Sequence, residues 1–299
     1  MPDPTATVTE VAGRRLRLTH LDRVLYPETG FTKAAVLRYY TLVAPAMLPH
    51  LAGRPASFLR LPDGVTGQRF WAKRVPPGAP AWVTGLDVTH RQETMRQTVV
   101  ADLPTLLWAA NLGCLEFHVP QWRERPELHD RLIVDLDPGE GAGVVECCAV
   151  ALVARELLAA DGLPCWPKTT GSKGLHLTVP LLPAPAERVA EYARQLARRL
   201  RQQLPELVVD QMAKQLRPGR VFVDWSQNNS AKTTVAAYSL RARPEPTASA
   251  PLDWSEVAGC RRPEQLVFDA DAVAERVQAA GDQQAALADP EQAAALPDS

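Results

Sequence analysis

The chain has 299 residues, of which 46% are hydrophobic and 22% charged, and its formal net charge is −1. These proportions are typical of a folded globular protein and exclude a wholly disordered chain. No stretch approaches the roughly 20 uncharged apolar residues of a membrane span, the N-terminus lacks the pattern of a secretory signal, and the five cysteines show no C-x-x-C spacing. We therefore expect a soluble cytoplasmic protein with no membrane partner, no disulfide framework and no structural zinc site.

The near-neutral total conceals two oppositely charged regions. Residues 244–299 hold 11 acidic and 3 basic side chains, whereas residues 1–243 hold 30 basic and 23 acidic ones. The larger region is moderately cationic and could meet a polyanion, and the C-terminal region is acidic.

The first half of the chain predicts one helix followed by short strands. Residues 1–13 are expected to be loose. Thr32 is a helix N-cap signal, and the apolar residues after it keep helical spacing up to Pro45. Alternating runs between Pro and Gly breakers then predict antiparallel strands at residues 57–61, 69–72, 82–83, 87–89 and 97–100. A short helix is expected over 103–113.

From about residue 131, predicted strands and helices alternate. Strands are expected at 131–136, 175–182 and 221–223, and helices at 144–160 and 187–203. The fold class is therefore α+β (or α/β) with two sub-lobes. A helix near 270–280 and a frayed tail complete the chain, so that residues 271–299 are expected to lie outside the main domain.

Two carboxylates end the predicted strand at 131–136. Asp135 and Asp137 flank Leu136, and residues two apart on a strand project from the same face. Converging carboxylates repel each other unless a cation lies between them, and oxygen ligands suit Mg²⁺ or Mn²⁺. An ordinary polar turn explains Asp-Pro-Gly equally well, so this motif alone leaves both interpretations open.

A third carboxylate, Asp224, ends the apolar run at 221–223. Three carboxylates at strand ends are the geometry of a two-metal centre for phosphoryl transfer, although Asp is also a common residue where a strand ends.

Residues 168–176, Lys-Thr-Thr-Gly-Ser-Lys-Gly-Leu-His, form a glycine-rich segment that leads into a strand. Its backbone N–H groups, hydroxyls and lysine could bind phosphate oxygens. It is not a P-loop, because the Gly-x-x-x-x-Gly-Lys spacing is absent and a strand follows.

Taken in order, three motifs resemble those of the archaeo-eukaryotic primase superfamily and, more closely, the polymerase domain of bacterial ligase D. They are Asp-Leu-Asp-Pro at 135–138, Thr-Gly-Ser-Lys-Gly-Leu-His at 170–176 and Val-Phe-Val-Asp-Trp-Ser-Gln-Asn at 221–228. Further matching stretches lie at 18–27, 53–55, 60–64, 70–73, 238–244 and 251–254. The similarity covers about residues 14–270 and implies a primase-like catalytic core with two mixed or antiparallel sheets and flanking helices.

The resemblance also implies roles for individual residues. Metal ligands for two divalent ions, Mn²⁺ or Mg²⁺, would be Asp135, Asp137 and Asp224. An incoming NTP or dNTP would be bound by His118, Thr170, Lys173, His176, Arg217, Gln227 and Arg241. Phe70 and Trp71 match an aromatic pair that packs against the template strand; the family usually has Phe at the second position and Ser where this chain has Thr170.

The family recognises a DNA 5′-phosphate through an asparagine and two lysines near the N-terminus. Lys33 matches one lysine, Arg23 stands at the other, and His20 replaces the asparagine. Arginine can hold a phosphate bidentately, so the positive charge of the pocket is retained.

The implied function is a DNA-directed primase-polymerase that adds nucleotides, preferably ribonucleotides, to a DNA 3′ end during gap filling and double-strand break joining. Implied partners are DNA with gaps or breaks, the end-binding protein Ku and a separate ATP-dependent DNA ligase, and the implied location is the nucleoid. Two alternatives stay open. One is a catalytically silent module that binds 5′-phosphorylated DNA ends; the other is a metal-dependent phosphatase or nucleotidyltransferase with Asp-x-Asp on a different fold.

Overall fold

The computed structural model describes residues 6–90 and 93–297, which form two compact units, each built from separate segments of the chain. Unit 1 comprises the described residues of Met1–Val119, Val235–Ala248 and Phe268–Asp282; unit 2 comprises those of Pro120–Thr234, Ser249–Val267 and Gln283–Ser299. Both units mix helices with mainly antiparallel sheets, which confirms the predicted α+β class. In the part of the chain that is described, no helix combines the length and apolar character needed to cross a bilayer.

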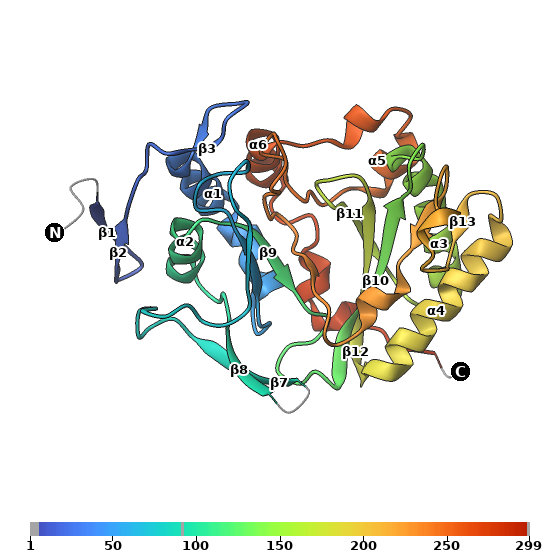
Figure 1. Cartoon of the computed structure of the whole chain (residues 1–299). Helices are drawn as coiled ribbons and strands as arrows, with labels where there is room; N and C mark the ends of the chain where they lie inside the picture. Colours follow the sequence, from blue (N-terminus) through green and yellow to red (C-terminus); the bar gives the residue numbers. More distant parts are fainter. Residues whose placement is uncertain (1–5, 91–92, 298–299) are drawn as a thin grey trace. The chain divides into compact units, whose positions relative to one another are not determined.

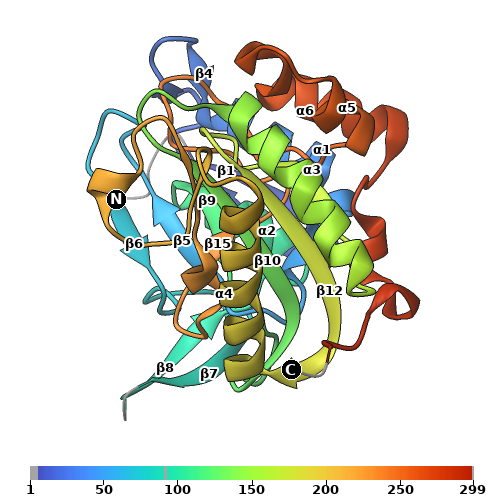
Figure 2. The same ribbon diagram turned by 90° about the vertical axis from the view of Figure 1, so that its right-hand side faces the viewer.

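Unit 1 is built around a four-stranded sheet with the order β15-β9-β5-β6, of which β9 is labelled in Figure 1 and all four strands in Figure 2. Its strands are β1 (Thr7–Val11), β2 (Arg14–Leu18), β3 (Val24–Tyr26), β4 (Phe31–Thr32), β5 (Ser57–Arg60), β6 (Phe70–Ala72), β7 (Gly85–His90), β8 (Glu93–Thr98) and β9 (Cys114–Val119), with β15 (Thr234–Val235) at the unit boundary. Its helices are α1 (Lys33–Leu51), α2 (Leu103–Asn111) and α6 (Ala270–Ala280). The helices α2 and α6 both pack against α1.

Helix α1 begins as predicted, because the Thr32 hydroxyl accepts a hydrogen bond from the Ala35 N–H at 3.2 Å. It does not stop at Pro45 but continues to Leu51. Proline removes one backbone donor from a helix, and the burial of Met47 and Leu51, both fully inaccessible to solvent, offsets that loss. Two further expectations were wrong: residues 82–83 form a turn, and residues 7–11 pair with β2 as a hairpin.

Unit 2 contains a five-stranded sheet with the order β11-β12-β10-β14-β13, in which only β13 and β14 run parallel. The strands are β10 (Leu128–Pro138), β11 (Trp166–Thr169), β12 (Leu175–Pro185), β13 (Val208–Val209) and β14 (Val221–Val223). The helices are α3 (Val144–Ala160), α4 (Ala186–Gln203) and α5 (Trp254–Gly259), with short 3₁₀ turns η1 (Lys214–Leu216) and η2 (Trp225–Asn228). Helices α3 and α4 contact each other and both β10 and β12, and they cover the same face of the sheet (Figure 2).

The C-terminal residues, which we expected to be frayed, lie against strand β12. The Leu182 N–H donates to the Ala294 carbonyl at 2.9 Å, and the Ala294 N–H donates to the Pro180 carbonyl at 3.1 Å. Ala and Gln composition alone gave no sign of this pairing, because the partner strand is more than 100 residues away in the sequence.

Asn228 ties η2 to the central strand of unit 2. Its side-chain oxygen accepts from the Ile133 N–H at 2.9 Å, and its amide group donates to the Ile133 carbonyl at 2.8 Å. The side chain therefore completes both hydrogen bonds that another strand residue would make with β10. Asn228 is fully buried, so these two backbone groups have no access to water.

We expect Asn228→Ala to lower the free energy of unfolding by about 2–4 kcal/mol, because it leaves the buried N–H and carbonyl of Ile133 without these hydrogen bonds. The matched control is Asn229→Ala, which removes the neighbouring exposed amide and should cost less than about 1 kcal/mol. Urea unfolding of both variants measures the difference. Equal losses would show that the Ile133 pairing does not stabilise this part of the sheet.

Candidate active site in unit 2 and its unit 1 counterparts

The register of unit 2 brings the three predicted carboxylates to one place. Asp135 and Asp137 lie on β10, and the antiparallel pairing of Leu136 with Val223 sets the next residue, Asp224, across from Asp135. The Asp224 N–H donates to the Asp135 carbonyl at 2.9 Å, which continues this register beyond the end of β14. Residues directly opposite on antiparallel strands share a face of the sheet, so Asp135, Asp137 and Asp224 lie on the same face.

Each carboxylate has a basic side chain as a neighbour. An oxygen of Asp135 lies 3.2 Å from Nε2 of His176, its direct cross-strand partner on β12. Asp137 lies 3.6 Å from a guanidinium nitrogen of Arg217, and Asp224 lies 3.8 Å from Nζ of Lys232. The side chains of Asp135 and Asp224 are 15% exposed and that of Asp137 is 55% exposed, so Asp137 is the most open of the three.

The three negative charges act on one another. Partial burial raises the pKa of Asp137, and the charges of Asp135 and Asp224 raise it further, against the opposing effects of Arg217 and Lys173. When the pKa of a carboxyl group rises in the folded state, its ionised form is less stable there than in the unfolded chain. This site would therefore be stabilised by a bound cation.

The donor set fits a hard divalent ion in chemistry and charge, because it consists of carboxylate oxygens that repel one another. Among residues 6–90 and 93–297, however, no three Asp, Glu, His or Cys side chains are arranged so that they already enclose a metal ion. The oxygens of Asp224 are engaged by neighbours: one accepts from the Ser226 N–H at 3.1 Å and the other from the Gln227 amide at 3.0 Å.

The glycine-rich segment forms a closed turn beside these carboxylates. The Thr170 N–H donates to the Gly174 carbonyl at 2.9 Å, and the Thr170 hydroxyl accepts from the backbone N–H groups of Ser172 and Gly174 at 3.3 and 3.2 Å. Gly171 has φ +66°, which favours glycine. The predicted hydroxyl therefore shapes the turn, and Lys173 is exposed at its tip.

Gly174 presses the turn against β10. A Cβ atom at this position would lie 2.1 Å from the Leu136 carbonyl oxygen, between the two carboxylates of the strand. Gly139 has the same role in the loop that follows β10, where a Cβ would lie 2.0 Å from the Arg217 carbonyl oxygen. Both loops flank the carboxylates because only glycine permits these approaches.

Arg217 is placed beside Asp137 by this second loop. Its guanidinium also lies over the ring of Phe222 at 3.8 Å from the ring centroid. Phe222 is the direct cross-strand partner of Asp137, which explains how one arginine reaches both. Unit 2 thus brings together all eight residues predicted in it: Asp135, Asp137, Asp224, Thr170, Lys173, His176, Arg217 and Gln227.

Unit 1 holds His118 and Arg241 together through Glu116. Nε2 of His118 lies 2.7 Å from one Glu116 oxygen, and Nε of Arg241 lies 3.2 Å from the other. The Ala242 N–H donates to that second oxygen at 2.8 Å. No motif of the sequence assigned a role to Glu116.

The predicted aromatic pair lies on β6, an edge strand of the unit 1 sheet. Phe70 is 42% exposed and Trp71 59% exposed, so two aromatic rings lie side by side in the sequence at the surface. The Trp71 ring also meets the His118 ring edge-on, with 4.9 Å between centroids.

His20, Arg23 and Lys33 form a second cluster in unit 1. The Arg23 N–H donates to the His20 carbonyl at 3.1 Å, and the Lys33 N–H donates to the Arg23 carbonyl at 2.8 Å. Burial, and then the nearby charge of Arg23, lower the pKa of Lys33 to about 8. The guanidinium of Arg23 is paired with Asp63 at 2.9 Å, an acidic neighbour that the sequence did not point to.

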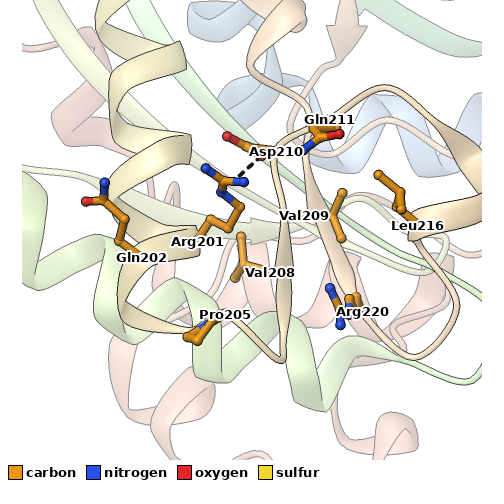
Figure 3. Close-up of a pocket in the computed structure, with 9 residues that line it drawn as sticks. All are labelled: Arg201, Gln202, Pro205, Val208, Val209, Asp210, Gln211, Leu216 and Arg220. Atoms are coloured by element: carbon orange, nitrogen blue, oxygen red, sulfur yellow. Dashed lines mark ion pairs between the residues drawn. The ribbon is translucent and has the colours of Figure 1, made fainter.

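A separate hollow of about 340 Å³ lies at the end of α4 in unit 2 (Figure 3). It is lined by Arg201, Gln202, Pro205, Val208, Val209, Asp210, Gln211, Leu216 and Arg220. Its central charges neutralise each other, because Arg201 lies 3.3 Å from Asp210. None of the predicted functional residues lines this hollow.

Sequence reasoning did not assign Glu116, Ser226 or Lys232. Ser226 and Lys232 contact each other and Asp224, and Ser226 lies inside a quoted motif. Its position two residues after a strand-end carboxylate is the signal that could have identified it, since Asp side chains commonly accept a hydrogen bond from the backbone two residues further on. No local signal marks Lys232.

Comparisons with known proteins identify the family of this chain. The family model for the LigD primase-polymerase domain matches residues 32–284. Over 274 residues the chain is 44% identical to the multifunctional non-homologous end joining protein LigD of Mycolicibacterium smegmatis, a match that covers 90% of this chain and 35% of that protein. The corresponding protein of Mycobacterium tuberculosis is 45% identical over 254 residues, which cover 82% of this chain and 34% of that protein. The chain thus spans about a third of the length of these curated relatives.

A solved structure is similar as well. The polymerase domain of Mycobacterium tuberculosis ligase D, in complex with DNA, superposes with a TM-score of 0.88 at 42% sequence identity. The match covers 92% of this chain and 98% of that one. This chain therefore belongs to the LigD primase-polymerase family, a family of nucleotidyltransferases.

Proposed function

We propose that this protein adds nucleotides, preferably ribonucleotides, to a DNA 3′ end in gap filling and in the joining of double-strand breaks. The observation that carries the proposal is the register of β10 and β14, which brings Asp135, Asp137 and Asp224 together beside a glycine-rich turn. The similar mycobacterial domain was solved with DNA, which supports DNA as the substrate here.

Asp135, Asp137 and Asp224 would hold two divalent ions, Mn²⁺ or Mg²⁺. Divalent cations in such sites make a hydroxyl a better nucleophile and neutralise charge on a departing pyrophosphate. His176 orients Asp135 through their 3.2 Å contact, and Gln227 orients Asp224 through a 3.0 Å hydrogen bond.

Positive charge near the carboxylates would bind the nucleotide phosphates. Lys173 and Arg217 supply it in unit 2, and Thr170 keeps the turn that carries Lys173 closed. In unit 1, His118 and Arg241 are proposed to contact the nucleotide. Each of these cations would form charge-assisted hydrogen bonds to phosphate oxygens.

Other groups of unit 1 would bind DNA. The exposed rings of Phe70 and Trp71 suit stacking against unpaired template bases. His20, Arg23 and Lys33 would bind a 5′-phosphate. Ku and an ATP-dependent DNA ligase are proposed as the partners in end joining.

The decisive experiment measures incorporation of ATP and of dATP on a gapped duplex, with and without a 5′-phosphate, in Mn²⁺ and in Mg²⁺. We expect extension that requires a divalent ion, prefers ATP and increases with the 5′-phosphate. Binding of the 5′-phosphorylated duplex without any incorporation would instead identify a catalytically silent end-binding module. Hydrolysis of a simple phosphoester without DNA would support a phosphatase.

The proposed 5′-phosphate site predicts a pH dependence. Because the pKa of Lys33 is about 8 in the free protein, binding at higher pH requires this side chain to take up a proton. The preference for a 5′-phosphorylated over a 5′-hydroxyl gapped duplex should be nearly constant up to about pH 7 and fall by about twofold between pH 7 and 8. Well above pH 8 it should fall toward about tenfold per pH unit.

The control for this prediction is Lys33→Arg, which keeps its charge throughout this range. Its phosphate preference should stay level to pH 9.5, as measured by the ratio of the two dissociation constants. A wild-type ratio that is independent of pH would remove Lys33 from the proposed phosphate site.

A further inference from the structure

We infer that Glu116 is a positioning residue for nucleotide binding: its buried carboxylate holds the imidazole of His118 and the guanidinium of Arg241 in place for phosphate oxygens. The inference rests on the proposed function, because it assumes that His118 and Arg241 contact the nucleotide. It adds a residue to which neither the sequence motifs nor the comparisons give a role.

Both contacts come from the local fold. Glu116 and His118 are two residues apart on β9 and therefore share a face of the strand. Glu116 is 4% exposed, and its two oxygens are divided between two side chains, at 2.7 Å to Nε2 of His118 and 3.2 Å to Nε of Arg241. Such a carboxylate can only accept hydrogen bonds, so Nε2 of His118 must carry the proton in this contact.

The backbone that carries Arg241 is held from two sides. The Glu116 oxygen facing Arg241 also accepts from the Ala242 N–H at 2.8 Å, and the hydroxyl of Tyr26 donates to the Arg241 carbonyl at 2.9 Å. The arginine is therefore fixed at its main chain as well as at its guanidinium, which limits the entropy that it would lose on binding a ligand.

Glu116 stays ionised at all working pH values. Burial alone would raise its pKa, but the hydrogen bond from His118, the charges of Arg241 and His118 and the Ala242 N–H lower the pKa to about 2. One negative charge thus faces the guanidinium of Arg241 and an imidazole N–H of His118.

The cluster borders an exposed surface of unit 1. His118 is 9% exposed, and the Trp71 ring that meets it edge-on at 4.9 Å is 59% exposed. The imidazole is consequently held by a buried carboxylate on one side and an exposed ring on another. A purely structural salt bridge would need neither the contact with Trp71 nor the division of one carboxylate between two side chains.

The test is Glu116→Gln, which keeps the size of the side chain and removes its charge. The KM for ATP should rise by about 10-fold to 100-fold, in the range seen when an orienting partner of a binding residue is removed, and kcat should change much less. In a background that already carries His118→Asn and Arg241→Lys, the same substitution should raise KM by less than about two-fold, because it acts through those residues. Glu275→Gln, the same chemical change at an exposed position of α6, is the matched control.

Each outcome decides the matter. An unchanged KM, or equal effects of Glu116→Gln in both backgrounds, would overturn the inference. Glu116→Asp keeps the charge, and a KM between those of wild type and Glu116→Gln would support the inference; loss of the folded state in both variants, seen by circular dichroism, would show a structural role and overturn it. If wild type and Glu275→Gln themselves incorporate no nucleotide, the proposed function fails, which is a distinct result.

Discussion

The Asp137→Ala variant should extend no primer in Mn²⁺ while it binds gapped DNA nearly as tightly as the wild type. Asp137 is the most exposed of the three carboxylates, at 55%, and the positive charges of Lys173 and Arg217 act on it. Losing one carboxylate from a site proposed to hold two cations removes charge stabilisation from the reaction itself, so we expect kcat to fall by about 10³-fold or more. DNA binding would persist because its proposed contacts are made by other residues.

The same substitution, although it abolishes primer extension, should slightly raise the stability of the metal-free protein. The pKa of Asp137 is raised in the folded protein, so its ionisation weakens the fold as the pH rises from the usual carboxyl range through that pKa. In a chelator at pH 7, Asp137→Ala should therefore melt slightly above the wild type. Added Mn²⁺ should raise the melting temperature of the wild type, and of the variant much less.

Glu140→Ala provides the control, since Glu140 is an exposed carboxylate three residues further along the chain. Its extension rate should match the wild type, and Mn²⁺ should stabilise it equally. Extension by Asp137→Ala at more than a tenth of the wild-type rate would rule out Asp137 as a ligand, whatever its effect on melting.

The sequence predicted those features of the site that are encoded locally. The apolar run at 221–223 became β14 without any change of bounds, and 144–160 became helix α3. The strand-end positions of Asp135, Asp137 and Asp224 followed from the same patterns, because each carboxylate directly follows or interrupts an apolar run. Strand alternation alone placed Asp135 and Asp137 on one face.

What the sequence could not supply is the partner of each group. His176 lies opposite Asp135 because β10 and β12 pair in one particular register, a long-range pairing that strand alternation alone does not specify. Asn228 completes the hydrogen bonds of Ile133 from 95 residues away. Glu116 and Lys232 likewise acquire their roles only through contacts made in the folded chain.

Local patterns also misled where tertiary packing prevailed. Proline signalled the end of a helix at Pro45, but the burial of the following turns carried α1 on to Leu51. This short-range rule was outweighed by contacts that it does not include. The Thr170 hydroxyl accepts two backbone N–H groups of its own turn, and its proposed contact with phosphate stays a prediction.

The close approach of Gly174 to β10 leads to the second large effect. In Gly174→Ala the new methyl carbon would lie 2.1 Å from the Leu136 carbonyl oxygen and 3.3 Å from Cδ of Pro138. Both belong to the central strand of the unit 2 sheet and cannot yield, so the turn from Thr170 must move away. We expect the free energy of unfolding to fall by about 1–3 kcal/mol, and the KM for ATP to rise by about tenfold or more, as Lys173 moves with the turn.

Gly259→Ala is the matched control, because a Cβ at that position in the same unit meets no atom within 4 Å. Its stability in urea and its KM for ATP should equal those of the wild type. The two measurements on Gly174→Ala also separate two effects. A raised KM for ATP with an unchanged free energy of unfolding would place the turn at the nucleotide. A lower free energy of unfolding with an unchanged KM would confine the role of the turn to folding. If the KM and the free energy of unfolding of Gly174→Ala both equal the wild-type values, the turn can move away from β10 to make room for a Cβ that would otherwise lie 2.1 Å from the Leu136 carbonyl oxygen. The proposed phosphate contact of Lys173 would then lose its structural support.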